Sequence, residues 1–600
     1  MKKLLLLLLI SIPFVSGARE RDVDTARDIA YNFLESKALT KSSSISLGLV
    51  YSGAGMPQTR SAGSAPSFYV FDNEIGPGFV IVSGDDAVQQ ILAYSFDSNF
   101  KAVNIPSNLS WWLDTMNSQV ENLRKINAVA SDSAILPGTD EVLYETAKWD
   151  QSSPFSNQCP TMMSNGKLQQ TLTGCGPTAI AIALRYKQYP ANGTGTTPEY
   201  ITYQDKLVVS ARELGQEYLW DEMPLYSPYK KAWTDVQKEQ VARLIADIGA
   251  AAQVEYGLSA TSISSYDVAP ALTEYFGFDK SAFLAERDYY TDKDWFPIIK
   301  QEIRDNGPVI YSGSSAYSGH MFVLDGYDSK DYFHVNWGWS GSNDGYYSLS
   351  AMNPGKPESG PGSTAHVNGY NRSHDAVINL IPDKGGKETM QITFYNVSNN
   401  DGTFKGLSVN EYDPVSGLPS DLNVGAVKNK GWDTCVGLKI RLAVVDRDMN
   451  ARKVLWETTI NELRYANYVS YPHVQVTDYG NIDFGYKLIA QYYDPNEDEW
   501  KKIRADRSAR GVESISLADE YSIEESTVFR YDNSTRTITL KTKDGVEVRC
   551  FREGLDCAVE DKGDKTFVIE TASLEAGAYT IGLSKASEYH ELRFVVGTKR

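Results

Sequence analysis

The chain has 600 residues, a formal net charge of −19 and 42% hydrophobic residues. One hydrophobic core rarely grows beyond roughly 250–300 residues, so this length predicts several domains. The negative charge argues against nucleic acid or an anionic membrane surface as the main partner. Aromatic residues make up 12% of the chain, with 37 Tyr and 46 Gly, a composition that favours sheet-rich structure with many turns.

Residues 1–18 have the pattern of a secretory signal peptide. Lys2 and Lys3 precede an apolar run, and small residues follow it. The run is shorter than the roughly 20 apolar residues that a membrane-spanning helix needs. We therefore expect an exported protein, either secreted or retained in the periplasm or at the cell surface. The odd number of cysteines, five, predicts at least one thiol outside any intramolecular disulfide.

Residues 19–140 read as an α+β region that ends in a linker. An amphipathic helix is expected at 26–34 and a second helix at 108–116, with strands at 68–71 and 79–82 between them. Residues 128–140 are small, polar and interrupted by Pro and Gly, which indicates an exposed linker. Exposed linkers are preferred sites of proteolysis.

Residues 141–383 mix helix and strand, and the chain beyond them changes character. Strands are expected to crowd residues 308–350, and helices are expected at 177–188, 235–249, 268–276 and 294–305. From residue 388 onward, short alternating runs recur between turn signals, a spacing typical of β-sandwiches. The length fits two immunoglobulin-like β-sandwich modules, at 388–512 and 515–600. The predicted fold class of the whole chain is α+β.

Cys175 is the first candidate for catalysis. It lies between Gly174 and Gly176, and an apolar helical pattern begins directly behind it. Unpaired N–H groups and the positive dipole end at a helix N-terminus favour a thiolate. The glycines are expected to leave backbone room for a bound chain to approach. A small buried cysteine ahead of a core helix remains the alternative for this stretch taken alone.

A cysteine nucleophile needs a base, and His320 is the best candidate among the six histidines. Its distance from Cys175 along the chain falls in the range of roughly 130–150 residues that papain-like enzymes show. An antiparallel hairpin around Asp328 would bring His320 and Asn336 side by side, within a residue or two of register. A carboxamide there can orient the imidazole, as in a Cys-His-Asn triad. Trp337 and Trp339 could shield that hydrogen bond from water.

The other histidines are weaker candidates. His334, in the same hairpin, is the rival base but fits a packed strand residue better, and His366 and His374 are expected to be solvated loop residues. Acyl transfer also needs donors aimed at the developing oxyanion. The backbone N–H of Cys175 could supply one donor, and Gln151 is the side-chain candidate for a second. Taken alone, Gln151 is equally compatible with ordinary polar surface.

Several motifs in order resemble the streptopain family of papain-fold cysteine peptidases. The resemblance covers about residues 65–382, and its motifs are Trp149-Asp-Gln151, Thr173–Ala179, Trp220–Pro224, Gly319-His320 and His334–Gly341. Gly78–Asp86 is similar to the prosegment of that family. Gly360–Tyr370 is similar to its glycine-rich loop beside the cleft, although this copy is less rich in glycine.

The resemblance implies a secreted zymogen with protein or peptide substrates. It assigns Cys175 as nucleophile, His320 as base and acid, Gln151 as oxyanion donor, Asn336 as the group that orients His320, and Trp337 as the ring packed over that pair. The segment from 19 to about 140 would act as an intramolecular inhibitor, with activation by cleavage within 128–147. No cofactor and no metal are expected.

Two other functions remain open at this point. The chain could be a surface adhesin with an inactive peptidase-like domain, in which the C-terminal modules bind a host or cell-surface ligand. It could also be an acyltransferase, because Cys-His-Asn chemistry can pass an acyl group to an amine instead of water.

Overall fold

The structure is a computed structural model. It describes residues 20–37, 45–53, 66–125, 141–314, 319–349, 374–395, 406–506, 512–517 and 528–596, apart from single residues and short turns inside these ranges. The predicted signal peptide, the linker at 128–140, the loop at 360–370 and His366 lie outside the described residues.

The N-terminal region is a curved sheet with one helix on each face. The expected helix at 108–116 is longer than predicted and extends to Lys125, because its buried face continues through Met116 and Val120. The elements are α1 (Val23–Lys37), β1 (Leu47–Ser52), β2 (Phe68–Asn73), β3 (Phe79–Ser83), β4 (Ile91–Ser95) and α2 (Ser107–Lys125).

The central region, 141–383, carries the four predicted helices within two or three residues of their expected ends. Its helices are α3 (Cys175–Lys187), α4 (Asp235–Ala251), α5 (Val268–Tyr275) and α6 (Asp292–Asn306), with 3-10 turns η1 (Trp220–Glu222), η2 (Ser265–Asp267) and η3 (Arg287–Tyr289). Its main strands are β5 (Val142–Leu143), β10 (Phe283–Glu286), β11 (Val309–Ser314), β12 (Gly319–Tyr327), β13 (Tyr332–Asn336), β14 (Gly345–Ser348) and β15 (Asp375–Ile378). Two small hairpins add β6 (Thr161–Ser164) with β7 (Lys167–Gln170), and β8 (Tyr200–Ile201) with β9 (Val208–Val209).

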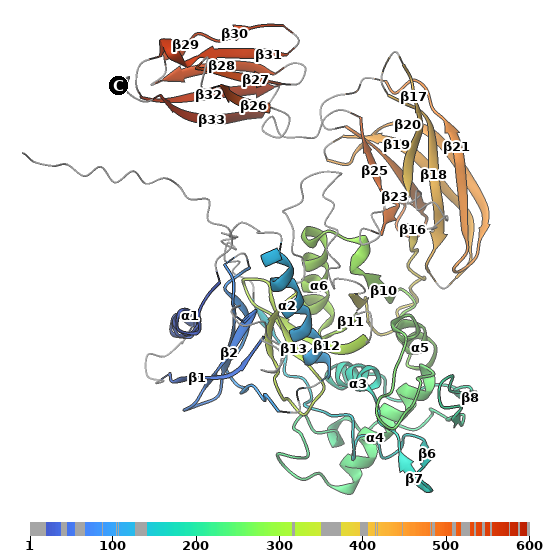
Figure 1. Cartoon of the computed structure of the whole chain (residues 1–600). Helices are drawn as coiled ribbons and strands as arrows, with labels where there is room; N and C mark the ends of the chain where they lie inside the picture. Colours follow the sequence, from blue (N-terminus) through green and yellow to red (C-terminus); the bar gives the residue numbers. More distant parts are fainter. Residues whose placement is uncertain are drawn as a thin grey trace, which may run out of the picture.

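One sheet runs through both of these regions (Figure 1). In the described part of the chain it has eleven strands, in the order β1-β2-β3-β4-β14-β13-β12-β11-β15-β10 with β5 paired to β12. The two regions meet where β4 pairs with β14, with Tyr94 opposite Tyr346. The N-terminal region is therefore joined to the central region by backbone hydrogen bonds as well as by side chains.

Alternation along the central strands divides the core in two. Met321 and Val323 of β12 pack with helices α3, α4 and α5 on one face of the sheet. Phe322 and Leu324 pack on the other face with α6 and with α2 of the N-terminal region. The side chains of a strand alternate between faces, so each strand contributes to both cores.

The C-terminal part forms two separate pairs of sheets, each pair around its own core (Figure 1). The first module contains β16 (Ile392–Phe394), β17 (Leu407–Tyr412), β18 (Pro419–Asn429), β19 (Cys435–Val445), β20 (Ala451–Leu463), β21 (Tyr468–Gln475), β22 (Lys487–Asp494), β23 (Glu499–Lys502), β24 (Arg504–Ala505) and β25 (Ser514–Ser516). The second contains β26 (Val528–Asp532), β27 (Thr537–Lys541), β28 (Glu547–Arg552), β29 (Leu555–Cys557), β30 (Glu560–Asp561), β31 (Thr566–Glu570), η4 (Thr571–Ser573), β32 (Gly577–Lys585) and β33 (Glu588–Val596).

The first module extends beyond the end predicted for it at residue 512. Strand β25 pairs with β22, and the backbone N–H of Leu517 donates a hydrogen bond of 3.0 Å to the carbonyl of Tyr486. The alternating run Ser514–Ser516 therefore closes the first module. Among the helices of the described residues, none has the length and apolarity that crossing a membrane requires.

Candidate active site

Helix α3 begins at Cys175, as the sequence predicts, but the space beside its glycines is already occupied. Gly174 has a φ of 82°, and a Cβ there would lie 2.6 Å from the carbonyl oxygen of Thr261. A Cβ on Gly176 would lie 2.3 Å from Cγ2 of Ile263. The lack of a Cβ at these glycines therefore admits the protein's own segment 261–263 beside Cys175, and the approach of a bound chain to the glycine backbone stays a prediction.

The Cys175 thiol lies against strand β12. Its Sγ accepts a hydrogen bond of 3.4 Å from the backbone N–H of Met321, the residue after His320. Burial raises the pKa of the Cys175 thiol, and the backbone N–H groups of Met321, Cys175 and Gly176 oppose that rise only in part. The helix N-terminus does supply donors, but burial outweighs them, so the thiol is protonated at neutral pH in this state.

His320 directly precedes Met321, the residue whose N–H donates to the thiol, but its own side chain forms no hydrogen bond with Cys175 among the described contacts. It is partly buried, and burial lowers its pKa to about 4. Among the contacts of the described residues, no hydrogen bond joins His320 to Cys175. Met321 belongs to the α3 face of the sheet, so alternation places His320 on the opposite face, with Phe322. The full-length chain therefore holds a neutral thiol against the strand that carries a neutral imidazole, without a hydrogen bond between the two side chains among the described contacts.

The predicted register between His320 and Asn336 is wrong. Asn336 lies opposite Val323, and His320 lies opposite Gly313 of β11. The hairpin turn is centred further along than Asp328, and a bulge between Leu324 and Gly326 shifts the pairing again. His320 and Asn336 are therefore not side by side.

The Asn336 side chain is fully buried and has other partners. Its Nδ2 donates to Oγ1 of Thr146 at 2.9 Å and to the carbonyl of Ala147 at 3.0 Å, and its Oδ1 accepts from the N–H of Gly338 at 3.0 Å. The carboxamide thus ties the beginning of the central region to strand β13. No contact with His320 is found among the described residues.

Trp337 packs on the face of the sheet that carries Phe322, and it lies in the same core as residues of the N-terminal region. Its ring lies 4.9 Å from Phe322 and 5.0 Å, edge to face, from Tyr347. Tyr347 in turn meets Trp112 of helix α2 at 4.9 Å, also edge to face. These four rings connect the face that carries His320 to the N-terminal region.

Gln151 lies beside the loop that precedes Cys175, here called the nucleophile loop, and Gln151 is 8% exposed. Its carbonyl accepts hydrogen bonds from the backbone N–H of Thr173 at 3.1 Å and from Oγ1 of the same residue at 3.2 Å. Thr173 Oγ1 also lies 2.9 Å from Thr178 Oγ1, inside the first turns of α3. The structure therefore brings Gln151 to the loop that ends at Cys175.

His334, the rival base, lies in a buried ion pair. Its Nδ1 is 2.5 Å from Oδ1 of Asp325, and both residues are almost completely buried. Burial would lower the pKa of His334, but the charge and hydrogen bond of Asp325 outweigh it and raise that pKa. The other oxygen of Asp325 accepts a hydrogen bond from Oγ1 of Thr146. This pair is a structural element of the sheet rather than a base facing the thiol.

Two features were missed or misread from the sequence. Asp325 interrupts an otherwise apolar strand before a glycine, and that polar residue was the available signal for the buried network around His334. His374 was expected to be solvated, but it is completely buried, and its Nδ1 lies 2.8 Å from the hydroxyl of Tyr311. It directly precedes β15, a position that could not be recognised because the sequence upstream has the composition of a loop.

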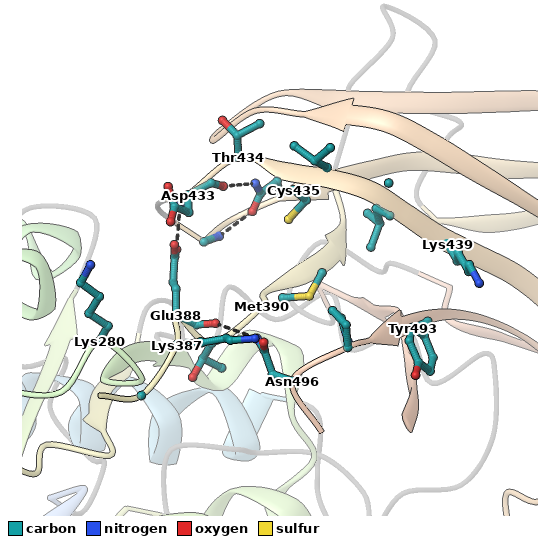
Figure 2. Close-up of a pocket in the computed structure, with 18 of the residues that line it drawn as sticks. Lys280, Lys387, Glu388, Met390, Asp433, Thr434, Cys435, Lys439, Tyr493 and Asn496 are labelled. Atoms are coloured by element: carbon teal, nitrogen blue, oxygen red, sulfur yellow. Dashed lines mark hydrogen bonds between the residues drawn. The ribbon is translucent and has the colours of Figure 1, made fainter. Parts of the chain in front are cut away.

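Cys435, which is distant from Cys175 in the sequence, lines a cavity. The cavity, of about 820 Å³, lies where the central region meets the first C-terminal module, and Lys280, Glu388, Cys435 and Tyr493 are among its lining residues (Figure 2). Burial raises the pKa of the Cys435 thiol to about 11, and the charge of Glu388 adds to the rise. No histidine is among the described lining residues, and the carboxylates of Glu388 and Asp433 raise the thiol pKa, so this thiol is a poor candidate for a nucleophile. No group of three or more His, Cys, Asp or Glu side chains in the described part of the chain is arranged to hold a metal ion.

Comparison with known proteins identifies two parts of the chain. The sequence model of the peptidase C10 family matches residues 149–347, and that of the Spi protease inhibitor matches residues 18–120. Streptopain from Streptococcus pyogenes is 30% identical over 390 residues, which are 60% of this chain and 92% of streptopain. The thiol protease/hemagglutinin PrtT of Porphyromonas gingivalis is 29% identical over 401 residues, 63% of this chain and 43% of PrtT.

Among solved structures, a fragment of prointerpain A from Prevotella intermedia is 26% identical and covers 56% of this chain and 99% of the fragment, with a TM-score of 0.46. The family match spans Cys175 and His320, and the identity to streptopain extends over nearly the whole of that protein. The chain therefore belongs to the streptopain-like peptidase C10 family, as its motifs predict, and is a cysteine peptidase.

Proposed function

We propose that this protein is an exported cysteine endopeptidase made as a zymogen, with Cys175 as its nucleophile and His320 as its base and acid. The observation that carries the proposal is the hydrogen bond from Met321 N–H to Cys175 Sγ, which fixes the thiol one residue from His320 at the start of α3. A signal peptide at 1–18 would direct export.

In the active enzyme the imidazole takes the thiol proton and the Cys175 thiolate attacks a peptide carbonyl, forming a C–S bond. The backbone N–H of Cys175 and the side-chain amide of Gln151 would donate to the oxyanion. His320 then gives its proton to the leaving amine as the C–N bond breaks. Water, deprotonated by His320, attacks the thioester and releases the acid and the thiol.

The N-terminal region would hold the enzyme silent until it is removed. Its match to the Spi protease inhibitor and the sheet that it shares with the central region support an inhibitory prosegment. Removing it would free the face on which His320 lies, so that the imidazole could turn to the thiol.

The cleavage that activates the protein is proposed between 128 and 141. The range predicted from the sequence for this cleavage extends to residue 147. In the structure, however, Val142 and Leu143 pair with β12, Thr146 donates a hydrogen bond to Asp325, and Ala147 is fully buried. A protease would have to pull these residues out of the sheet to cut among them.

We propose changed roles for the two remaining candidates. Asn336 would position Thr146 and Ala147, which follow β5 near the beginning of the mature enzyme, instead of orienting His320. Trp337 would support the β12 face through Phe322.

The C-terminal modules are proposed to be immunoglobulin-like sandwiches. A second candidate function, binding of a host or cell-surface ligand by these modules, is favoured by their separate cores. The name of the similar protein PrtT likewise joins a thiol protease with a hemagglutinin.

The test uses purified protein from which the N-terminal region has been removed, with reductant and an unfolded protein substrate. We expect Cys175→Ala to abolish degradation and a chain lacking 518–600 to retain it. Product masses that show free acids support hydrolysis, whereas products joined to an added amine would indicate acyl transfer. Unchanged degradation by Cys175→Ala would exclude the proposed nucleophile, and full activity loss on removing only 518–600 would argue against modules that serve binding alone.

A further inference from the structure

A short segment, residues 261–266, forms a wall beside Cys175. Thr261 donates from Oγ1 to the carbonyl of Leu172 at 2.8 Å, just ahead of the nucleophile loop. Ile263 lies against Gly176, where even a Cβ would clash. Any shift of this segment therefore moves the atoms that surround the start of α3.

The other end of the segment is anchored by two carboxylates. Ser265 donates from Oγ to Oδ2 of Asp375 at 2.9 Å, and Tyr266 donates from its hydroxyl to Oε2 of Glu286 at 2.9 Å. Glu286 of β10 and Asp375 of β15 lie directly opposite each other in the sheet. The position of the wall thus depends on two acidic side chains that face each other.

Two like charges directly opposite in a sheet repel each other. Burial and the charges of Glu286 and Asp288 together raise the pKa of Asp375 to about 7, while the hydrogen bond from Ser265 and the charge of Lys430 oppose that rise. Ser312 of β11 also faces this carboxyl, with its Oγ 3.3 Å from Oδ2. An arrangement in which both carboxylates are ionised needs a cation near them.

The cation comes from the first C-terminal module. Lys430 follows β18, its side chain is only 11% exposed, and its Nζ forms an ion pair with Glu286. The ammonium also lies 4.5 Å from the ring centre of Tyr289 and 5.7 Å from that of Tyr266. Burial would lower the pKa of Lys430, but the charge of Glu286 outweighs it and raises that pKa, so the side chain stays charged.

A second cation holds the module in the same place. Arg504, at β24, donates from Nη1 to the carbonyl of Tyr289 at 3.2 Å and lies 3.3 Å from Oδ2 of Asp294. Its guanidinium is also 4.5 Å from the ring centre of Tyr290. The docking of the module on the peptidase is therefore specific, with Lys430 as the residue that reaches the acidic pair.

We propose that Lys430 is a positioning residue of the peptidase: by holding Glu286, it fixes the 261–266 wall against the nucleophile loop, and the first C-terminal module is thus a working part of the enzyme. The proposal rests on the assignment of Cys175 as nucleophile. Loss of the cation would leave Glu286 facing Asp375 alone, so that Tyr266 and Ser265 lose fixed acceptors or Asp375 takes up a proton.

The test measures kcat/KM against pH for matured Lys430→Met, with Lys430→Arg and Lys428→Met beside it. Lys428 is a matched control, two residues away on β18, whose ammonium lies over Tyr395 instead. We expect Lys430→Met to lower kcat/KM by between about 5-fold and 150-fold, the range of energetic coupling between sites. Because the variant lacks the charge that lowers the Asp375 pKa, any acid limb set by Asp375 should move to higher pH. Lys430→Arg should recover most of the activity, and Lys428→Met should stay within twofold of wild type.

A double exchange, Lys430→Glu with Glu286→Lys, keeps the test decisive if Lys430→Met folds poorly. We expect each single exchange to lower activity and the pair to restore at least part of it. Equal kcat/KM and equal pH profiles for Lys430→Met, Lys428→Met and wild type would overturn the proposal, as would a double exchange no better than its single variants. Cys175→Ala, run in parallel, separates this failure from failure of the nucleophile assignment, because only the latter leaves Cys175→Ala active.

Discussion

The backbone N–H of Met321 donates a hydrogen bond of 3.4 Å to Sγ of Cys175. This contact joins the helix that carries the thiol to the strand that carries His320, without joining the two side chains themselves. Burial raises the thiol pKa and lowers that of the imidazole, so proton transfer between them is unfavourable in the full-length chain. Activation has to change the surroundings of both groups as well as open the way to them.

Replacing His320 should remove catalysis but leave the fold intact. General acid–base catalysis by one side chain is worth roughly 10²–10⁴-fold in rate, so matured His320→Ala should lose at least that much kcat/KM. His473→Ala is the control, because that side chain is 72% exposed in a C-terminal module. The measurement is peptide hydrolysis by protein whose circular dichroism matches wild type. Equal activity of the two variants would show that His320 is not the base.

Replacing Trp112 should loosen the N-terminal region. Its ring meets Tyr347 edge to face, and truncating a buried Trp to Ala typically costs about 3–5 kcal/mol. Unmatured Trp112→Ala should therefore react faster with a thiol reagent at Cys175 than wild type does. Ile75→Ala, at a residue that is 58% exposed, should react at the wild-type rate. Identical rates for all three proteins would mean that this packing does not restrain the thiol.

Asn336→Ala separates a structural role from an orienting one. Removing the carboxamide leaves buried groups of Thr146 and Ala147 without their donor, a loss of about 1–3 kcal/mol. We expect a lower thermal midpoint in the Cys175→Ala background and, in matured enzyme, an unchanged pH optimum. An unchanged midpoint with a shifted pH optimum would instead support the orienting role for His320.

The ion pair between His334 and Asp325 should make stability depend on pH. The folded pKa of His334 is raised, so its contribution is complete below its unfolded pKa of about 6.5 and is lost as the pH rises through the folded value. The folded pKa of Asp325 is lowered, by the charge and hydrogen bond of His334 against the effect of burial. Its contribution is therefore present above about pH 4 and is lost as the pH falls through the folded value.

Urea unfolding of Cys175→Ala between pH 5 and 9 checks this dependence. The wild-type pair should show a midpoint that declines toward pH 9, and His334→Gln should show a lower midpoint with a flatter slope. Parallel slopes for the two proteins would place the pH dependence elsewhere.

Local patterns in the sequence predict the elements well, and long-range register less well. The apolar spacing behind Cys175 predicts the start of α3 to within two residues, because glycine and proline mark it. The register between β12 and β13 could not be predicted, because the hairpin turn is centred beyond Asp328 and a bulge near Leu324 shifts the pairing again, and periodicity carries no sign of either. Asp375 and Glu286 are distant in sequence and meet only in the folded sheet. Their contact with Lys430 therefore could not be predicted from local sequence patterns.

The most direct test of the account is to map where an epoxide-type thiol inhibitor reacts, at pH 7, before and after removal of the N-terminal region. Peptide mapping resolves Cys159, Cys175, Cys435, Cys550 and Cys557 separately in one sample. The account predicts modification of Cys175 in the matured protein in step with loss of activity, and almost none in the full-length chain. Equal modification of Cys175 in both forms, or loss of activity while Cys175 stays unmodified, would contradict it.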